Sequence, residues 1–383
     1  MRTGVPGFKG YRLQQAREAM GLSQTSLADL LEVSKQAISQ YEKNSDSPGI
    51  EVFDRMRRIL KHDAQFFLKP QTTSLSTSIR FYRSLASTTK TARNKAEAWK
   101  TWSRELIAYM AEFVEFPKSN FPIFDDLPPD PNLLDMEKIE VIAADVRDHL
   151  NLGEGPITNL VELAENNGAI VFRYGLGAET LDALSEWLQP ENLPLVILNA
   201  DKNVAVRSRL DLGHELGHMV LHRRMAEGAL RHSDVFRLAE EQAFRFGAAL
   251  LLPAHSFLED LYSISLDALL ALKLKWKVSI AMMIERLKDL NIVSSEQYKR
   301  LRINYSARQW NKEEPYDEEI EIERPEFPER AMKLILDSRV QTVDQFSVNT
   351  GFSLEWIERL LNLPPDVISP KRKLKLVHFK RPA

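Results

Sequence analysis

Residues 207–222 read RSRLDLGHELGHMVLH and place His214 and His218 four positions apart. On an α-helix, residues with this spacing lie on one face with Cβ atoms about 5–6 Å apart, so both imidazoles can reach one metal ion. Glu215 is placed to contact a metal-bound water without binding the metal itself. Apolar residues flank the motif on both sides, which indicates a buried helix. The stretch therefore predicts a metal centre on a helix in the core.

A third ligand is required, because a catalytic zinc site combines three protein ligands with one open position for water. His222 lies about 12 Å of helix rise from His214, so a continuous helix cannot bring both to one ion. We expect His222 to line the pocket, to support a ligand or to pack. The segment EEQAFRFGAALLLP begins with Glu240 and Glu241. One of these carboxylates is expected to point inward and complete a His₂Glu set, while the other is solvated.

The composition limits the kinds of chemistry available to this chain. It has 383 residues, 51 Lys and Arg against 54 Asp and Glu, and no cysteine. Without cysteine there is no disulfide, thiolate nucleophile, iron–sulfur cluster or Cys-based zinc site, so His and carboxylates must hold any metal. The length allows two or three domains. No signal peptide and no run of 18 apolar residues is present, so we expect a cytoplasmic protein without membrane contact.

Charge is distributed unevenly along the chain. Residues 1–70 carry 11 basic and 8 acidic side chains, and residues 80–104 carry 7 basic residues and one acidic. Residues 313–329 reverse this with 9 acidic side chains, and the tail from Lys371 has 6 basic residues and no acidic one. Such runs are solvated faces or interaction tails, so different segments are suited to different charged partners.

The first seventy residues predict a bundle of short helices. Apolar residues with helical spacing precede Gly21, which suits the position that follows a helix. Ser23 and Ser34 stand where the N-caps of two further helices are expected, and a loop at 44–49 precedes a fourth helix. Short helices joined by a tight turn form the helix-turn-helix arrangement.

The rest of the chain reads as a connector, a mixed α and β region and a helical end. Residues 80–115 have a helical pattern, and 117–131 form a Pro-rich linker. Short β-branched runs at 169–174 and 193–199 predict two strands. Helices are expected at 136–150, 157–166, 207–223, 233–252, 255–275, 278–290 and 295–305, followed by an acidic linker and three or four short helices within 329–367.

HELGHMVLH followed by EEQAFRFGAALLLP resembles the ImmA/IrrE family of metallopeptidases. The second motif of that family runs approximately E-x-E-A-N-x-F-A-A-x-L-L-M-P, which places its ligand glutamate on Glu240. Gln242 departs from a frequent Glu and Phe244 from the Asn. Arg207 and Arg209 match two arginines that commonly precede the first motif. The other matching positions are Ala243, Phe246, Ala248, Leu250, Leu251 and Pro253.

This resemblance implies a zinc-dependent hydrolysis of peptide bonds. Zinc would be held by His214, His218 and Glu240, and Glu215 would take a proton from the zinc-bound water and pass it to the leaving amine. Alongside the metal, the group that stabilises the oxyanion is not readable from the sequence. The candidates are His222, His232 and His255, and each also has a structural interpretation.

AREAMGLSQTSLADLLEVSKQAISQYEKNSDSP, within residues 11–68, resembles the Xre family of helix-turn-helix domains. In such domains the N-terminal part of the third helix meets base edges in the major groove of double-stranded DNA. This places Lys35, Gln36 and Ser39 for readout, with Gln24 near a phosphate. Lysine suits guanine and glutamine suits adenine. Use of the domain only for dimerisation or partner binding is the alternative.

Together the resemblances imply a mainly α protein: a helix-turn-helix bundle, then an α+β zincin-like metallopeptidase domain with a small sheet and C-terminal helical segments. We divide it into 1–70, a connector at 71–130, the metallopeptidase domain at 131–310 and a C-terminal part at 311–383. The implied function is a transcriptional regulator, active as a homodimer, that cleaves a protein such as a helix-turn-helix repressor.

Two alternatives remain at this stage. The zinc domain of a transcription factor or antitoxin could sense a ligand or a partner such as a toxin and cut nothing. The chain could also cleave itself within 117–131. The intact Glu215 favours an enzyme, and Phe244 slightly favours a sensor.

Overall fold

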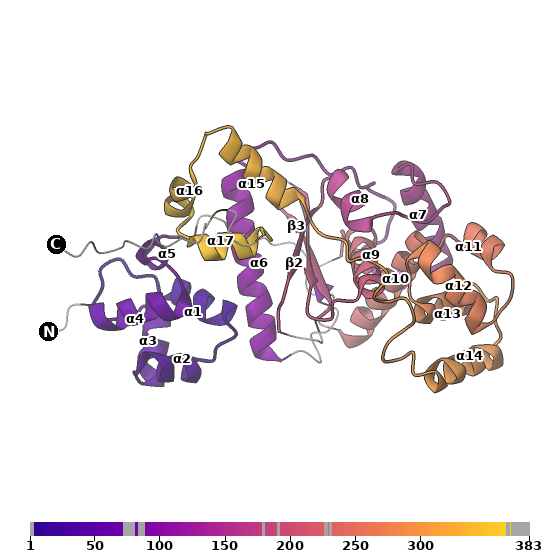
Figure 1. Ribbon diagram of the computed structural model, residues 1–383, viewed down its shortest axis with the longest axis horizontal. Helices are drawn as coiled ribbons and strands as arrows, with labels where there is room; N and C mark the ends of the chain where they lie inside the picture. The colour runs from indigo at the N-terminus through magenta and orange to yellow at the C-terminus, as the bar shows by residue number, and fades with distance from the viewer. Residues whose placement is uncertain are drawn as a thin grey trace, which may run out of the picture.

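The computed structural model describes residues 4–71, 81–82, 89–177, 181–189, 192–225, 229, 232–364 and 368. Helices predominate around one small sheet, which confirms the predicted fold class. In Figure 1 the N-terminal helices lie at one end of an elongated molecule, the sheet lies in the middle, and α11 to α14 lie at the other end. The basic tail from Lys371 lies outside the described residues.

The N-terminal unit is the predicted bundle of short helices. Ser23 caps α2 by accepting a hydrogen bond from the Ser26 amide at 2.9 Å, and Ser34 caps α3 by accepting one from Ala37 at 3.1 Å. Gly21 follows the first helix with a φ of 70°, which side chains disfavour. The helices are α1 (Gly10–Ala19), α2 (Gln24–Leu31), α3 (Lys35–Glu42), α4 (Ile50–Leu60) and α5 (Ala64–Leu68).

The sheet contains β1 (Phe81–Tyr82), β2 (Ile170–Tyr174), β3 (Ala183–Leu188) and β4 (Leu193–Asn199) in the order β1-β3-β4-β2. β2 pairs with β4 in parallel, whereas β3 is antiparallel to both β4 and β1. The predicted strands are therefore confirmed as β2 and β4. The helical prediction for 80–115 is wrong at residues 81–82, which pair with β3, and correct for α6 (Lys90–Met110).

β3 was not predicted because its sequence, ALSEWL, has two polar residues at its centre. Alternate side chains of this strand face opposite sides of the sheet, so Ser185 points to one side and Glu186 to the other. Glu186 lies on the side of α6, where Lys100 and Arg104 approach it to 3.6 and 3.5 Å. Burial of both polar residues depends on partners that are distant in sequence, and local patterns carry no trace of them.

Each face of the sheet contributes to a different hydrophobic cluster. Ile170, Phe172, Leu184 and Ile197 join α6 and the N-terminal helices. Their neighbours in the strands join α9 and α10 in the second cluster. The sheet is therefore the layer that separates the helix-turn-helix side of the molecule from the predicted metal centre (Figure 1).

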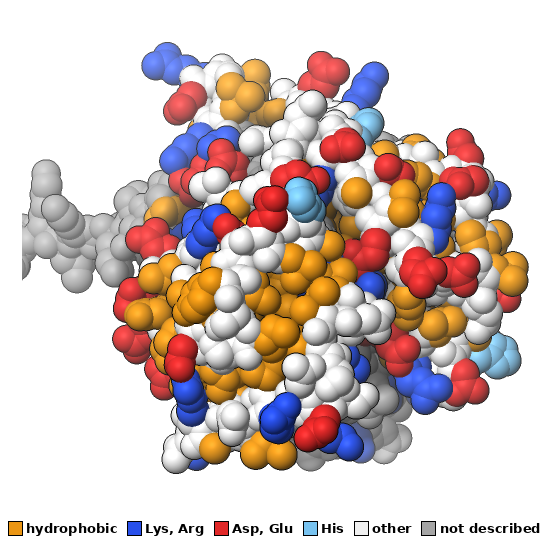
Figure 2. All heavy atoms as spheres, turned by 90° about the vertical axis from the view of Figure 1, so that its right-hand side faces the viewer, with side chains coloured by type: hydrophobic (Ala, Val, Ile, Leu, Met, Phe, Trp, Pro, Cys, Tyr) orange, Lys and Arg blue, Asp and Glu red, His pale blue; other side chains and the backbone are white. Residues whose placement is uncertain are grey.

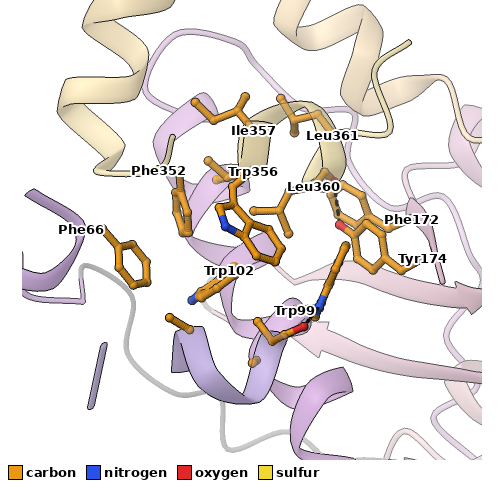
Figure 3. Packing of buried hydrophobic residues seen from close by; sticks show 14 of the residues in the cluster. Phe66, Trp99, Trp102, Phe172, Tyr174, Phe352, Trp356, Ile357, Leu360 and Leu361 are labelled. Carbon is orange, nitrogen blue, oxygen red and sulfur yellow. Dashed lines mark hydrogen bonds between the residues drawn. The ribbon is translucent and has the colours of Figure 1, made fainter. Parts of the chain in front are cut away.

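Aromatic side chains fill the junction between the N-terminal unit and the rest (Figure 3). Trp102 of α6 lies 5.4 Å from Phe66 of α5 and 4.9 Å from Trp356, between ring centroids. Trp99 lies 4.6 Å from Tyr174 of β2. One continuous core therefore joins the helix-turn-helix unit, α6, the sheet and the C-terminal helices. These last are the predicted short helices: α15 (Phe327–Asp337), α16 (Val343–Thr350) and α17 (Leu354–Leu360).

The remaining helices surround the second cluster. No described helix is both long and apolar enough to cross a membrane. The elements are η1 (Pro131–Leu133), α7 (Met136–His149), α8 (Leu160–Asn166), α9 (Ala205–Leu221), α10 (Ser233–Leu251), α11 (Ala254–Asp260), α12 (Leu266–Trp276), α13 (Ile280–Asp289) and α14 (Ser295–Ala307).

The acidic segment 313–329 is bound to the domain through its carboxylates. Glu314 is buried and accepts the backbone amides of Ile280 and Ala281 at the start of α13, at 2.8 and 3.0 Å. Glu323 accepts the amide of Leu160 at the start of α8, at 2.9 Å. Unpaired amides at a helix N-terminus favour an anion, so these acidic residues act as helix caps as well as carrying charge.

Figure 2 shows hydrophobic side chains gathered near the middle of the face formed by the helices at the right-hand end of Figure 1. Exposed large hydrophobic residues of these helices and of the loop before α12 are Tyr262, Ile264, Leu274 and Ile303. Apolar surface of this kind favours contact with another molecule.

The ion pair between Arg12 of α1 and Glu105 of α6 fixes the N-terminal unit to the body. Both Arg12 amino groups donate to Glu105, at 2.6 and 2.7 Å, and the two side chains are 2 and 5% exposed. Removing one partner of such a pair leaves a buried charge without compensation.

We expect Glu105→Gln to lower the free energy of unfolding by about 3–5 kcal/mol, because the Arg12 guanidinium stays buried. Urea denaturation of the full chain measures this. The matched control is Glu355→Gln in the exposed Lys61–Glu355 pair across the same junction, with an expected cost below about 1 kcal/mol. Equal costs for the two variants would contradict the assigned role of the buried pair.

Candidate metal centre and nucleic-acid interface

Helices α9 and α10 approach each other closely because glycines face each other at their contact. A Cβ added to Gly247 would lie 2.8 Å from the backbone carbon of Gly213, and one added to Gly217 would lie 2.8 Å from the carbonyl oxygen of Ala243. Real Cβ contacts are essentially never this short, so only glycine fits here. The close approach lets side chains from the two helices meet at one point.

His214 and His218 of α9 meet Glu240 of α10 at that point. The Nε2 atoms of the two histidines are 3.0 Å apart, and Glu240 oxygens lie 3.1 Å from His218 Nε2 and 3.4 Å from His214 Nε2. A tetrahedral zinc ion with bonds of about 2.0–2.1 Å separates its ligand atoms by about 3.3 Å. Both the donor types and their spacing therefore fit zinc, and among the described residues these three form the one group able to hold a metal.

Glu240 is the glutamate that faces the histidines, whereas Glu241 is exposed and lies 4.0 Å from Arg237. Burial raises the pKa of Glu240, but its interactions with the two histidines outweigh the burial and hold the pKa well below its usual range. Its carboxylate is therefore ionised at neutral pH, as metal binding requires.

Glu215 is buried beside the ligands and is held by the sheet. Ser185 of β3 donates its hydroxyl hydrogen bond to Glu215 at 2.6 Å. A hydrogen bond to a carboxylate favours its charged form and fixes its direction. The strand β3, which the sequence did not predict, thus supplies a contact to the predicted catalytic residue. The only sequence signal for this contact is the Ser near the centre of ALSEWL.

His222 lies behind His218, away from the convergence of ligands. The two Nδ1 atoms are 3.0 Å apart, and His222 Nε2 lies 3.0 Å from the Gln242 side-chain oxygen. Gln242 donates from its side-chain nitrogen to the carbonyls of Pro131 and Leu134 at 2.8 and 2.9 Å. Burial, followed by the charge of His218, lowers the pKa of His222 to about 3, so this imidazole is neutral near pH 7.

The other sequence candidates are spread over several places. His232 is exposed at the start of α10, and His255 is exposed on α11 near Glu259. Arg209 is buried and pairs with Glu323 of the acidic segment, while Arg207 is exposed. Arg207 lines the cleft that Phe244 also lines.

Phe244 lines a cleft of about 390 Å³ whose lining does not include His214, His218 or Glu240. Asp211 and Leu210 of α9 share this lining, and Asp211 precedes His214 by one helical turn. Ligand pockets have volumes from about 300 Å³ upward, so the cleft is large enough for a short peptide segment.

The third helix of the N-terminal unit offers the predicted DNA-reading residues to solvent. Lys35 and Gln36 are exposed, and Ser39 is half-buried. Gln24 instead donates to Glu42 at 2.7 Å, and Glu42 is paired with Arg17 at 2.5 Å. Helices α2 and α3 lie on the side of the N-terminal unit that is away from α16 and α17 (Figure 1), and the residues at the start of α3 are exposed.

Fold and site define a protein that joins a helix-turn-helix unit to a domain built around an HExxH helix. Two family models match it: a helix-turn-helix model at residues 13–64, and a peptidase-family model described as the IrrE N-terminal-like domain at residues 164–288. The chain is therefore a fusion of an Xre-like helix-turn-helix domain with an ImmA/IrrE-like domain, which confirms both resemblances. No curated protein matches the chain.

We expect the purified protein to hold about one zinc ion per chain, because three ligands with suitable spacing converge. Glu240→Ala should lose most of this zinc, and Glu241→Ala should keep it. Elemental analysis with matched protein concentrations gives both values. Loss of zinc in Glu241→Ala alone would show that the ligand is assigned one residue too early.

Proposed function

We propose that this protein is a DNA-binding transcriptional regulator whose metallopeptidase domain cleaves a protein partner, a helix-turn-helix repressor, to control gene expression. One observation carries the proposal: Glu215 lies buried beside a convergent His₂Glu set in the same chain as an exposed recognition helix. The two family models support both halves. The partners are thus double-stranded DNA and a protein substrate.

In the proposed mechanism His214, His218 and Glu240 hold zinc. Bound zinc would supply a Lewis acid that activates water and polarises the scissile carbonyl. Glu215 takes the proton of the attacking water and delivers it to the departing amine, as a general base and then a general acid. Ser185 keeps that carboxylate oriented through its 2.6 Å hydrogen bond. In this proposal the substrate enters through the cleft lined by Asp211 and Phe244, each about one helical turn from a metal ligand, His214 or Glu240.

DNA recognition is proposed for α3, with Lys35, Gln36 and Ser39 at base edges. A homodimer suits this role, because helix-turn-helix proteins pair half-sites about one helical turn apart on palindromic DNA. Gln24 reaches a phosphate in this proposal only if its amide leaves Glu42.

A sensor or antitoxin without proteolysis is the second candidate, favoured by Phe244 in place of the motif's Asn at the edge of the cleft. Self-cleavage in the Pro-rich segment has less support. Phe121 and Leu127 of that segment are buried in the second core cluster, and the Pro131 carbonyl is bonded to Gln242. A segment held in this way is not free to enter the cleft.

Glu215→Gln separates the enzyme from the sensor. Glutamine keeps the hydrogen bond from Ser185 but removes the basicity, so zinc content and DNA binding should persist while cleavage of the partner falls by about 10²–10⁴-fold. The assay is a promoter reporter in cells beside an immunoblot of the partner repressor, with Glu241→Gln as the control. Normal regulation by Glu215→Gln, with no partner fragment in the wild type, would favour the sensor.

Gln36→Ala should relax the DNA sequence preference at one base position, at a cost of roughly 1–3 kcal/mol for the preferred base. Selection from a random duplex pool, followed by titration of the enriched sequence, measures this. Gln14→Ala on the exposed face of α1 is the matched control and should bind as the wild type does. If wild-type protein enriches no motif at moderate salt, α3 does not read DNA.

A further inference from the structure

The hydrogen bonds around Gln242 fix the direction of its side-chain amide. Its nitrogen lies 2.8 and 2.9 Å from the carbonyl oxygens of Pro131 and Leu134, and carbonyls only accept. The opposite end of the amide, its oxygen, therefore faces His222 Nε2 at 3.0 Å. Gln242 is fully buried, so no water competes for these contacts.

This orientation determines the tautomer of His222 and then that of His218. The Gln242 oxygen accepts, so His222 must carry its proton on Nε2, and a neutral imidazole then has a lone pair on Nδ1. His218 Nδ1 lies 3.0 Å from that lone pair and must donate to it. The proton of His218 is thereby placed on Nδ1, which leaves the Nε2 lone pair pointing at His214 and Glu240.

We infer that Gln242 and His222 are positioning residues: through this relay from the carbonyls of Pro131 and Leu134, they hold His218 in the tautomer whose Nε2 binds metal. The inference rests on the proposed zinc site and extends it to groups that the ligand set does not include. It also gives a role to Gln242, which stands where the second motif of the ImmA/IrrE family often has Glu. An ionised glutamate would accept from His222 but would not donate to the two carbonyls.

The relay has a consequence for the unmetallated site. With His218 Nε2 as an acceptor, it faces the Glu240 carboxylate without a proton of its own to offer. Two acceptors at 3.1 Å favour a cation between them. The outer residues thus prepare the site for a metal before the metal arrives, as partners of metal-bound histidines commonly do.

The direct test is the tautomeric state of both histidines in the full chain after removal of metal with a chelator. Long-range ¹H–¹⁵N correlation spectra of protein labelled at its 8 histidines distinguish Nδ1–H from Nε2–H imidazoles. We expect Nδ1–H for His218 and Nε2–H for His222. Buried histidines with no relay would not be required to adopt opposite tautomers. Nε2–H at His218, or Nδ1–H at His222, overturns the inference.

Gln242 variants test the function of the relay. Gln242→Met keeps the length of the side chain but removes its acceptor, so His218 should lose the pure Nδ1–H state and the zinc dissociation constant should rise by about 10–100-fold. Gln242→Glu keeps an acceptor for His222 and should preserve the tautomers, with zinc affinity within a few-fold of wild type. Competition with a chromophoric chelator measures the affinity.

Leu250→Ala is the control for a mere loss of packing on the same helix, because Leu250 is buried in α10 but outside the relay. It should lower stability without changing the tautomers or the zinc affinity. Unchanged tautomers and affinity in folded Gln242→Met would refute the relay. If wild-type protein shows the expected tautomers but binds no zinc, the relay stands and the metallopeptidase proposal fails.

Discussion

Buried charged residues on α6 need partners of opposite charge from two sides, the helix-turn-helix unit and the sheet. This requirement holds the two parts of the protein together. Glu105 is paired with Arg12 of the helix-turn-helix unit, while Lys100 and Arg104 approach Glu186 of β3. An uncompensated buried charge costs several kcal/mol, so α6 is stable in this position only when both neighbours are docked. The tryptophans of the same helix extend this double attachment to β2 and to the C-terminal helices. The helix-turn-helix unit is consequently part of the body and not a tethered appendage.

The same arrangement also fixes residues at the metal centre. Glu186 and Ser185 are neighbours in β3, one facing α6 and the other facing Glu215. Two adjacent residues of β3 therefore make different contacts: one has a charge interaction with α6, and the other has a hydroxyl hydrogen bond to the predicted catalytic carboxylate. From the other side, Gly213 and Gly247 set the distance between the two helices that bear the ligands.

Local signals predicted most of what lies within one element or between adjacent ones. The serine caps of α2 and α3, the i,i+4 histidines and a carboxylate on the following helix are all readable because helix geometry fixes their spacing. The features that were not predicted depend on contacts between segments that are distant in the sequence. β3 lacks a β-branched run, Glu314 and Glu323 look like members of a charge run, and Gln242 looks like a departure from a motif until its carbonyl partners are known.

The short strand β1 has a consequence for any peptide that approaches the sheet. It occupies the outer edge of β3, with Phe81 in register with Ser185, the residue that holds Glu215. An extended chain that adds to a sheet edge needs free backbone groups there. To pair with Leu184 and Ser185 of β3, such a chain must first displace β1, which competes at an effective concentration on the order of millimolar because it belongs to the same molecule. A peptide that pairs weakly is therefore excluded from these two positions of β3, next to the residue that holds Glu215.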